Sequence, residues 1–244
     1  TESSRSGRGI GMLLKIKKFS VGGFYTTPRY YPLIRQIVSG YSIYTLNEKN
    51  VIQLGYLTKV DTMDKRVNLV SIAAKNRFFP WFSSNLEFSM GETQSVLHVA
   101  YKIGVSLSSK KIGTSIDYTY ADAEFPGYFS NTQRLFSNVY FNLSPFTFSV
   151  NYNTSSGKQA LDTLASNPPI TQGAGATASV RFLKYFSINM GALMSSSKED
   201  TPKPLFDYQR YNARVGLNAN FSKLNISIHS DGGKLRNYLV DKGT

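Results

Sequence analysis

Two histidines and a set of long charged side chains are the residues of this sequence that could carry chemistry. His98 lies within a run of alternating apolar positions, and His229 begins the segment His229-Ser230-Asp231-Gly232-Gly233. Asp–His pairs occur in hydrolases, but this one is a match at the scale of a dipeptide. No HExxH, Walker or GxSxG motif accompanies it. We therefore predict that the protein is not an enzyme.

The charged side chains are the more informative group, because bases outnumber acids at the polar positions of alternating segments. If those positions line a water-filled space, seven Lys or Arg face two acids. Such a lining lowers the barrier for anions, and His98 would add charge when protonated. The alternative is that these side chains only fill space or bond to loops. The predicted pore-lining residues are Lys15, Lys59, Glu87, His98, Lys102, Asp117, Arg134, Arg181, Arg210 and Arg214.

The composition excludes several other chemistries. The chain has 244 residues, no Cys and a formal net charge of +13. Without Cys there is no disulfide, thiolate metal site or Cys nucleophile, and we predict no metal and no cofactor. The net charge fits nucleic acid, anionic lipid or an anionic solute as partner. The bases fall on the face opposite the aromatics, which argues against a stacking platform for nucleic acid, so no nucleic-acid partner is predicted.

Alternating hairpins are the elements that position these residues, and the stretch from Ser95 to Tyr120 is the clearest. The odd positions from Leu97 to Leu107 are apolar or aromatic, and the even positions between them are small or polar. Because successive side chains of a strand point to opposite faces, this run has one apolar and one polar face. A polar turn at Ser108–Lys111 precedes a return strand with the same alternation. Each strand has about ten residues, which matches the ~9–11 that a tilted strand needs to cross a bilayer.

Seven such hairpins are predicted along the chain. Their turns are short, whereas the connections between hairpins are longer and carry most of the Pro and of the acids. Short turns at one end and long loops at the other are typical of an outer-membrane barrel. The turns are predicted at Lys17-Lys18, Asn47–Asn50, Lys75–Arg77, Ser108–Lys111, Ser144-Pro145, Leu183–Tyr185 and Ser222-Lys223, and the connections at Thr26–Ser39, Asp61–Arg66, Asp122–Thr132, Thr154–Gln172 and Ser195–Phe206.

From Ile10 to Ile228 the hairpins resemble Gram-negative outer-membrane β-barrel proteins of the porin type, although no motif indicates a specific family. The resemblance implies an all-β fold in the bacterial outer membrane. We expect an antiparallel, up-and-down transmembrane β-barrel of about 14 strands, with 14–16 allowed. A further strand at Lys234–Val240 is expected to return across the membrane.

Two features depart from the porin pattern. The chain ends at Val240–Thr244 without a closing aromatic, and its first strand enters from the long-loop side. Residues 1–244 are therefore expected to form a single β-barrel domain or a barrel segment of a longer chain. Residues 1–8 and 232–244 are candidates for loose tails.

The functional prediction is an outer-membrane channel that passes solutes with a preference for anions. Its expected partners are outer-membrane lipid, small anionic solutes or an exported polymer, and partner chains in a larger complex. One alternative is a part of a larger export or secretion channel for a polymer or protein. The other is a soluble β-rich binding or structural module, which would pack its apolar face inward and purify without detergent. A hydrolase would need His98 or His229 to be essential.

Overall fold

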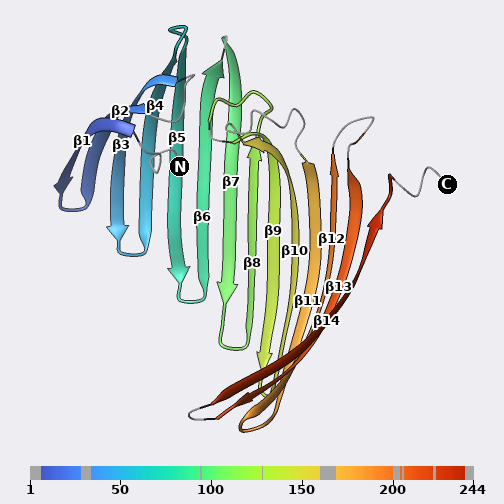
Figure 1. Ribbon diagram of the computed structural model, residues 1–244. Helices are drawn as coiled ribbons and strands as arrows, with labels where there is room; N and C mark the ends of the chain where they lie inside the picture. Colours follow the sequence, from blue (N-terminus) through green and yellow to red (C-terminus); the bar gives the residue numbers. More distant parts are fainter. Residues whose placement is uncertain are drawn as a thin grey trace. The chain divides into compact units, whose positions relative to one another are not determined.

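The computed structural model describes residues 7–28, 34–93, 95–127, 129–159, 169–199, 204, 206–221 and 224–239. These residues form one 14-stranded antiparallel sheet, in which each strand lies beside its neighbours in the sequence (Figure 1). The predicted all-β, up-and-down architecture and the strand number are confirmed. Within the described ranges, no helix is long and apolar enough to cross a membrane.

The strands are longer than the usual strand of a soluble protein, which has about 5–6 residues. Their bounds are β1 Gly7–Ile16, β2 Phe19–Pro28, β3 Ile34–Asn47, β4 Asn50–Asp61, β5 Arg66–Phe79, β6 Phe82–Thr93, β7 Val96–Ser108, β8 Ile112–Ala121, β9 Phe129–Leu143, β10 Phe146–Gln159, β11 Pro169–Leu183, β12 Phe186–Glu199, β13 Asp207–Asn220 and β14 Asn225–Asn237.

The third predicted turn is wrong. The sequence pattern predicts it at Lys75–Arg77, but β5 continues to Phe79 and the turn lies at Pro80-Trp81. The register between β5 and β6 shifts between Asn76 and Phe79. An extra residue of this kind breaks the two-residue alternation locally, so the sequence pattern indicated the end of the strand too early. The predicted turn at Ser222-Lys223 lies outside the described residues, and the other turns fall close to where they were expected.

The connections between hairpins are shorter than predicted, because the strands extend past their apolar positions. Thr154 pairs with Gln172, and Ser155 with Thr171, inside the segment expected to be a loop. Polar side chains on both faces do not interrupt a ladder of backbone hydrogen bonds. Residues 160–168 lie outside the described part of the chain.

The strand expected to return at Lys234–Val240 is also a wrong prediction. Residues from Lys234 to Asn237 continue β14 and pair with β13, where Lys234 lies opposite Tyr211. Residues 232–237 are therefore strand and not tail, as is the start of β1 at Gly7–Arg8. The rest of the predicted tails, residues 1–6 and 240–244, is outside the described ranges.

The chain packs as two compact units. Unit 1 comprises Thr1–Val105, Thr119–Thr132 and Lys158–Leu164, and unit 2 comprises Ser106–Tyr118, Gln133–Gly157 and Ala165–Thr244. In both units the register aligns apolar side chains across neighbouring strands on one face. In unit 1, for example, Leu54 lies opposite Ile72, and in unit 2, Met190 lies opposite Val215. Polar side chains occupy the intervening positions, and this second face is called the polar face below.

Candidate functional site

The ten predicted pore-lining residues all lie on the polar face of their unit. Register places six of them directly, for example Lys15 opposite Ser20 and Arg214 opposite Gly191. His98, Lys102, Asp117 and Arg134 share this face by strand alternation. Unit 1 carries Lys15, Lys59, Glu87, His98 and Lys102, and unit 2 carries Asp117, Arg134, Arg181, Arg210 and Arg214.

In unit 1 the polar face is partly covered by the chain itself. The segment Asp122–Gly127, which follows β8, is called the covering segment. Its Phe125 is only 7% exposed and packs against Leu69 and Ala121. The cluster is completed by Leu57, Val67 and Ala100. All of these strand residues stand at positions of the polar face, so a small apolar patch interrupts that face where the segment docks.

Lys59 and Gly91 are the strand residues that contact Pro126 of the covering segment. The Lys59 side chain is 9% exposed, and its Nζ donates a hydrogen bond of 2.8 Å to the carbonyl oxygen of Pro126. A Cβ added at Gly91 would stand 2.6 Å from Cγ of Pro126, so only glycine leaves room for the proline ring. Lys59 is thus on the predicted face, but it supports the segment instead of facing open space.

Asp122 fixes the start of the covering segment to β7. Its backbone N donates to Val99 O at 3.0 Å, and its Oδ2 accepts from Val99 N at 2.7 Å. Its Oδ1 accepts the Tyr120 hydroxyl at 3.0 Å. Farther along, Nε2 of His98 lies 3.8 Å from Oε2 of Glu124. Polar contacts at both ends and an apolar contact in the middle therefore hold the segment against the sheet.

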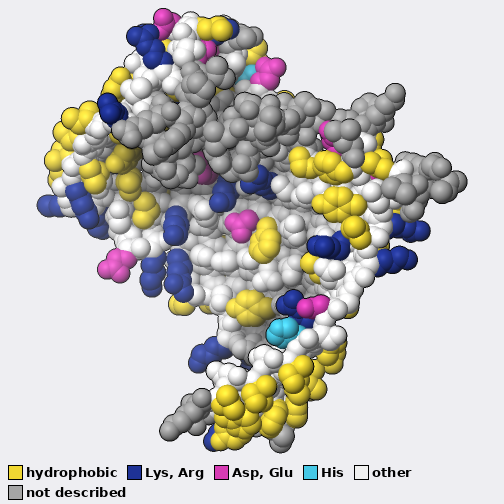
Figure 2. All heavy atoms as spheres, viewed as in Figure 1, with side chains coloured by type: hydrophobic (Ala, Val, Ile, Leu, Met, Phe, Trp, Pro, Cys, Tyr) yellow, Lys and Arg dark blue, Asp and Glu magenta, His cyan; other side chains and the backbone are white. Residues whose placement is uncertain are grey.

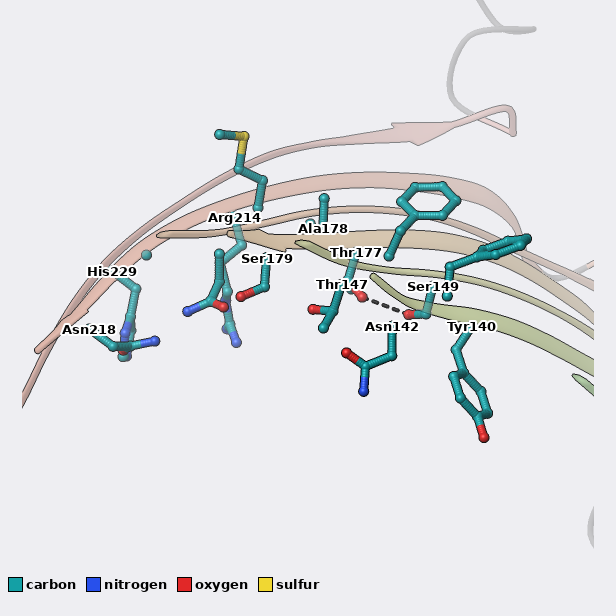
Figure 3. A pocket seen from close by; sticks show the side chains of 16 residues that line it. Tyr140, Asn142, Thr147, Ser149, Thr177, Ala178, Ser179, Arg214, Asn218 and His229 are labelled. Carbon is teal, nitrogen blue, oxygen red and sulfur yellow. Dashed lines mark hydrogen bonds between the residues drawn. The ribbon is translucent and has the colours of Figure 1, made fainter. Parts of the chain in front are cut away.

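In unit 2 the polar face is hollowed into an open pocket of about 500 Å³, which the strands from β9 to β14 line. In Figure 3, Asn142, Ser149 and His229 point to the same side of the sheet. Four apolar side chains, Phe141, Phe148, Ala178 and Met190, also line the pocket. Among its polar groups, Ser149 Oγ and Thr177 Oγ1 are 2.7 Å apart. The polar-face residues of the pocket are Tyr140, Asn142, Thr147, Ser149, Thr177, Ser179, Asn189, Gly191, Arg214, Gly216, Asn218 and His229.

The Arg214 guanidinium at this pocket is paired with Asp231. Nε donates to Oδ1 at 2.5 Å and Nη2 to Oδ2 at 3.3 Å, which is a two-pronged contact. The Asp231 carboxylate, which is two residues from His229 in the sequence, therefore bonds to Arg214. Among the described residues no group of three or more His, Cys, Asp or Glu side chains could hold a metal ion.

Sequence reasoning missed several charged residues of the polar face, among them Asp61, which ends β4 two positions after Lys59. Lys75 lies opposite Asn85 on this face, whereas the sequence pattern predicts a turn at this residue. Glu199 and Asp231 share the polar alternation of β12 and β14. Both follow the last apolar position of their strand, so the pattern gave no reason to continue the strand through them. The polar face is accordingly less one-sided in charge than predicted.

No family model and no curated protein sequence matches the chain. Among solved structures, a BenF-like porin from Pseudomonas fluorescens Pf-5 has a TM-score of 0.48 at 11% identity, with 94% of this chain and 73% of that chain covered. OccK7 (OpdD) of Pseudomonas aeruginosa has a TM-score of 0.46 at 12% identity, with coverage of 94% and 73%. A loop deletion mutant of OmpT, an outer membrane protein of Vibrio cholerae, has a TM-score of 0.43 at 6% identity, with coverage of 93% and 91%. These values do not assign the chain to a family.

Proposed function

We propose that this chain forms the wall of a β-barrel channel in a bacterial outer membrane, which passes solutes and prefers small anions. The observation that carries the proposal is the exposure of the apolar face. Ile10 and Met12 are 77% and 78% exposed. The other strands also carry large apolar side chains that are exposed. Exposed apolar surface costs about 25 cal/mol per Å² in water. Contact with lipid chains removes this cost.

Aromatic clusters at the short turns support a membrane environment. Phe79 and Trp81 stack with ring centroids 5.1 Å apart. In the other unit, Tyr185 and Phe221 lie 5.5 Å apart. Aromatic rings with a polar edge gather where a membrane meets water, so each cluster suits a rim of the lipid-facing band of its own unit.

A soluble module would need the opposite arrangement. In a soluble sheet protein the apolar face is covered and the polar face meets water. The buried hydrophobic residues in the described part of the chain are only Ile37, Val60, Leu69, Ala121, Phe125 and Ala219. Three of these belong to the docking of the covering segment. A core of this kind does not replace the apolar face as a source of stability.

The proposed anion preference rests on unpaired bases of the polar face. Lys15, Lys75, Lys102, Arg181 and Arg210 form no ion pair with another described residue. The acids of that face include Asp61, Glu87, Asp117, Glu199 and Asp231, and Asp231 is neutralised by Arg214. Dark blue Lys and Arg side chains are spread over a largely white surface in Figure 2. An excess of fixed positive charge raises the local concentration of anions.

The test is a planar-bilayer recording under a salt gradient, after purification in detergent. We expect conduction and a reversal potential of the sign for anions. Replacing Arg181 and Arg210 by Gln should move the reversal potential toward zero. The control is Lys198→Gln, which removes one positive charge from the opposite face of β12 and should change little, whereas Arg181→Gln alone should already shift the reversal potential. The difference should shrink at 1 M salt, where the screening length is about 3 Å.

Each other result would change the proposal. A folded chain that stays monodisperse without detergent would favour the soluble module. Cation selectivity would refute the anion preference. A folded, lipid-inserted chain that does not conduct would favour one wall of a larger export channel that is completed by partner chains.

A further inference from the structure

The pocket of unit 2 has a chemistry different from that of the unpaired bases. Asn142, Asn189 and Asn218 contribute amides. Thr147, Ser149, Thr177 and Ser179 contribute hydroxyls. Each of these groups both donates and accepts hydrogen bonds. A bound anion would use only the hydrogen-bond donors of these side chains, and an apolar solute would use neither the donors nor the acceptors. A hydroxyl-rich solute would use both the donors and the acceptors.

The charge of the pocket is also balanced. Among the described residues that line it, Arg214 is the only Lys or Arg, and both prongs of its guanidinium are occupied by Asp231. The unpaired Arg181 and Arg210 do not line it. Electrostatic attraction for anions therefore arises elsewhere on the polar face, and this site selects by hydrogen bonding and shape.

Tyr140 adds a fixed aromatic surface at one end of the pocket. Its ring lies over Gly113 so closely that a Cβ at position 113 would overlap with the ring atoms. Its hydroxyl is 3.1 Å from Ser108 Oγ. One side of the ring therefore lies against β8, its hydroxyl is next to Ser108, and the residue lines the pocket. A sugar ring has an apolar C–H face and a polar rim, which matches an aromatic face surrounded by amides and hydroxyls.

We propose that this pocket binds a neutral, polyhydroxylated solute of the sugar class, and that it gives the channel a preferred substrate in addition to its anion preference. The inference rests on the proposed channel function for its transport role. The volume of about 500 Å³ falls within the range of about 300–1,000 Å³ that is common for small-molecule sites. Tyr140 supplies the stacking surface, and Asn189, Asn218 and Ser179 supply hydrogen bonds.

The experiment measures the block of ion current by maltose in planar bilayers, and maltose binding to the detergent-solubilised chain by calorimetry. Tyr140→Ala should weaken maltose binding by about tenfold, which corresponds to 1.4 kcal/mol. The matched control is Tyr41→Ala in unit 1, because Tyr41 lies over Gly22 in the same way but is not part of the pocket. Tyr41→Ala should leave maltose binding unchanged.

A second pair of variants guards against misfolding. Asn189→Leu and Asn218→Leu keep the side chains close in size, and each should weaken maltose binding while the far-UV circular dichroism of the variant in detergent matches that of the native chain. Glucose 6-phosphate and gluconate test the alternative of an anion site. Binding of these anions with no binding of maltose would overturn the inference, as would equal loss in the Tyr140 and Tyr41 variants.

The two proposals fail in different ways. If the chain conducts ions but maltose neither blocks the current nor binds in detergent, the sugar site is refuted and the channel stands. If the chain does not conduct but still binds maltose through Tyr140, the channel is refuted and the binding site stands.

Discussion

The polar faces of the two units differ in what covers them. In unit 1 the covering segment lies on the face, and in unit 2 the face is an open pocket. The strands that present these faces follow the same alternation of apolar and polar positions. The difference arises from exceptions to the alternation. Leu57 and Leu69 stand at polar positions in unit 1, whereas the pocket of unit 2 is lined at those positions by Ser, Thr and Asn.

Such exceptions decide whether a loop can dock. Burying a Phe side chain contributes about 1.5–3 kcal/mol where apolar neighbours replace water. Leu69 and Ala121 provide these neighbours for Phe125. Over hydroxyls and amides the same docking would remove hydrogen-bonded water without an equal return. The clustered apolar residues Leu57 and Leu69 on the polar face therefore mark where the covering segment docks.

The largest effect that we expect comes from Phe125→Ala. Truncating a buried Phe costs about 3–5 kcal/mol, and here the loss would fall on the docking of the covering segment. The segment should become accessible to added protease, and single-channel conductance should rise because the polar face of unit 1 is uncovered. Phe88→Ala, on the exposed apolar face of unit 1, is the control and should leave conductance unchanged. Persistent protection in the Phe125 variant would show that the apolar patch does not hold the segment.

The next effect tests the faces themselves with a neighbouring pair of residues in unit 1. Leu54 stands on the apolar face, and Gln53 stands on the polar face, opposite Ile43. Leu54→Arg should lower the free energy of unfolding in lipid vesicles by about 2–4 kcal/mol, because it places a charge toward lipid. Gln53→Arg should be tolerated. The measurement is guanidinium unfolding of vesicle-inserted protein, and equal losses in the two variants would contradict the assignment of faces.

The faces of the strands were predictable from the sequence, whereas the covering of one of them was not. The alternation from Leu97 to Leu107 depends only on the two-residue period of a strand, which a single sequence displays. The covering segment depends on Lys59 reaching Pro126, 67 residues later, and on Leu69 meeting Phe125. Contacts between such distant positions leave no periodic signal. For the same reason Lys59 was predicted on the correct face but not beneath a loop.

The bulge between Asn76 and Phe79 shows a second limit. The extra residue shifts the alternation of apolar and polar positions, so the two-residue pattern in the sequence ends before the strand ends. Lys75 was lost from the predicted polar face in this way. Asp231 was missed for another reason, because β14 continues past Ile228 with polar side chains on both faces. Because Asp231 pairs with Arg214, it neutralises one of the bases that were predicted to favour anions.

A glycine in each unit gives a smaller and more direct comparison. A Cβ at Gly91 would stand 2.6 Å from Pro126 Cγ, whereas the nearest atom to a Cβ at Gly216 is 3.6 Å away. Gly91→Ala should therefore displace the covering segment at a cost of about 1–3 kcal/mol. Gly216→Ala should be accepted by the open pocket. Protease accessibility of the covering segment and guanidinium unfolding are measured for both variants. Equal changes in the two variants would mean that the covering segment moves aside for the added methyl group at no cost in stability.

The smallest effect on stability, and the sharpest on function, is expected at Arg214 and Asp231. Their side chains are 68% and 54% exposed, so water and salt screen the pair and its loss should hardly change unfolding. The charge on the polar face changes by one unit in each single variant. Asp231→Asn frees the guanidinium and should increase anion selectivity, whereas Arg214→Gln leaves a carboxylate and should decrease it. The double variant should return the reversal potential to near its native value, because it removes a pair that was already neutral.

Lys59→Met in unit 1 is the counterpart, since its ammonium lies beneath the covering segment, and it should alter protease accessibility more than selectivity. If Arg214→Gln and Asp231→Asn shifted the reversal potential in the same direction, the pair would act by shaping the pocket and not by its charge.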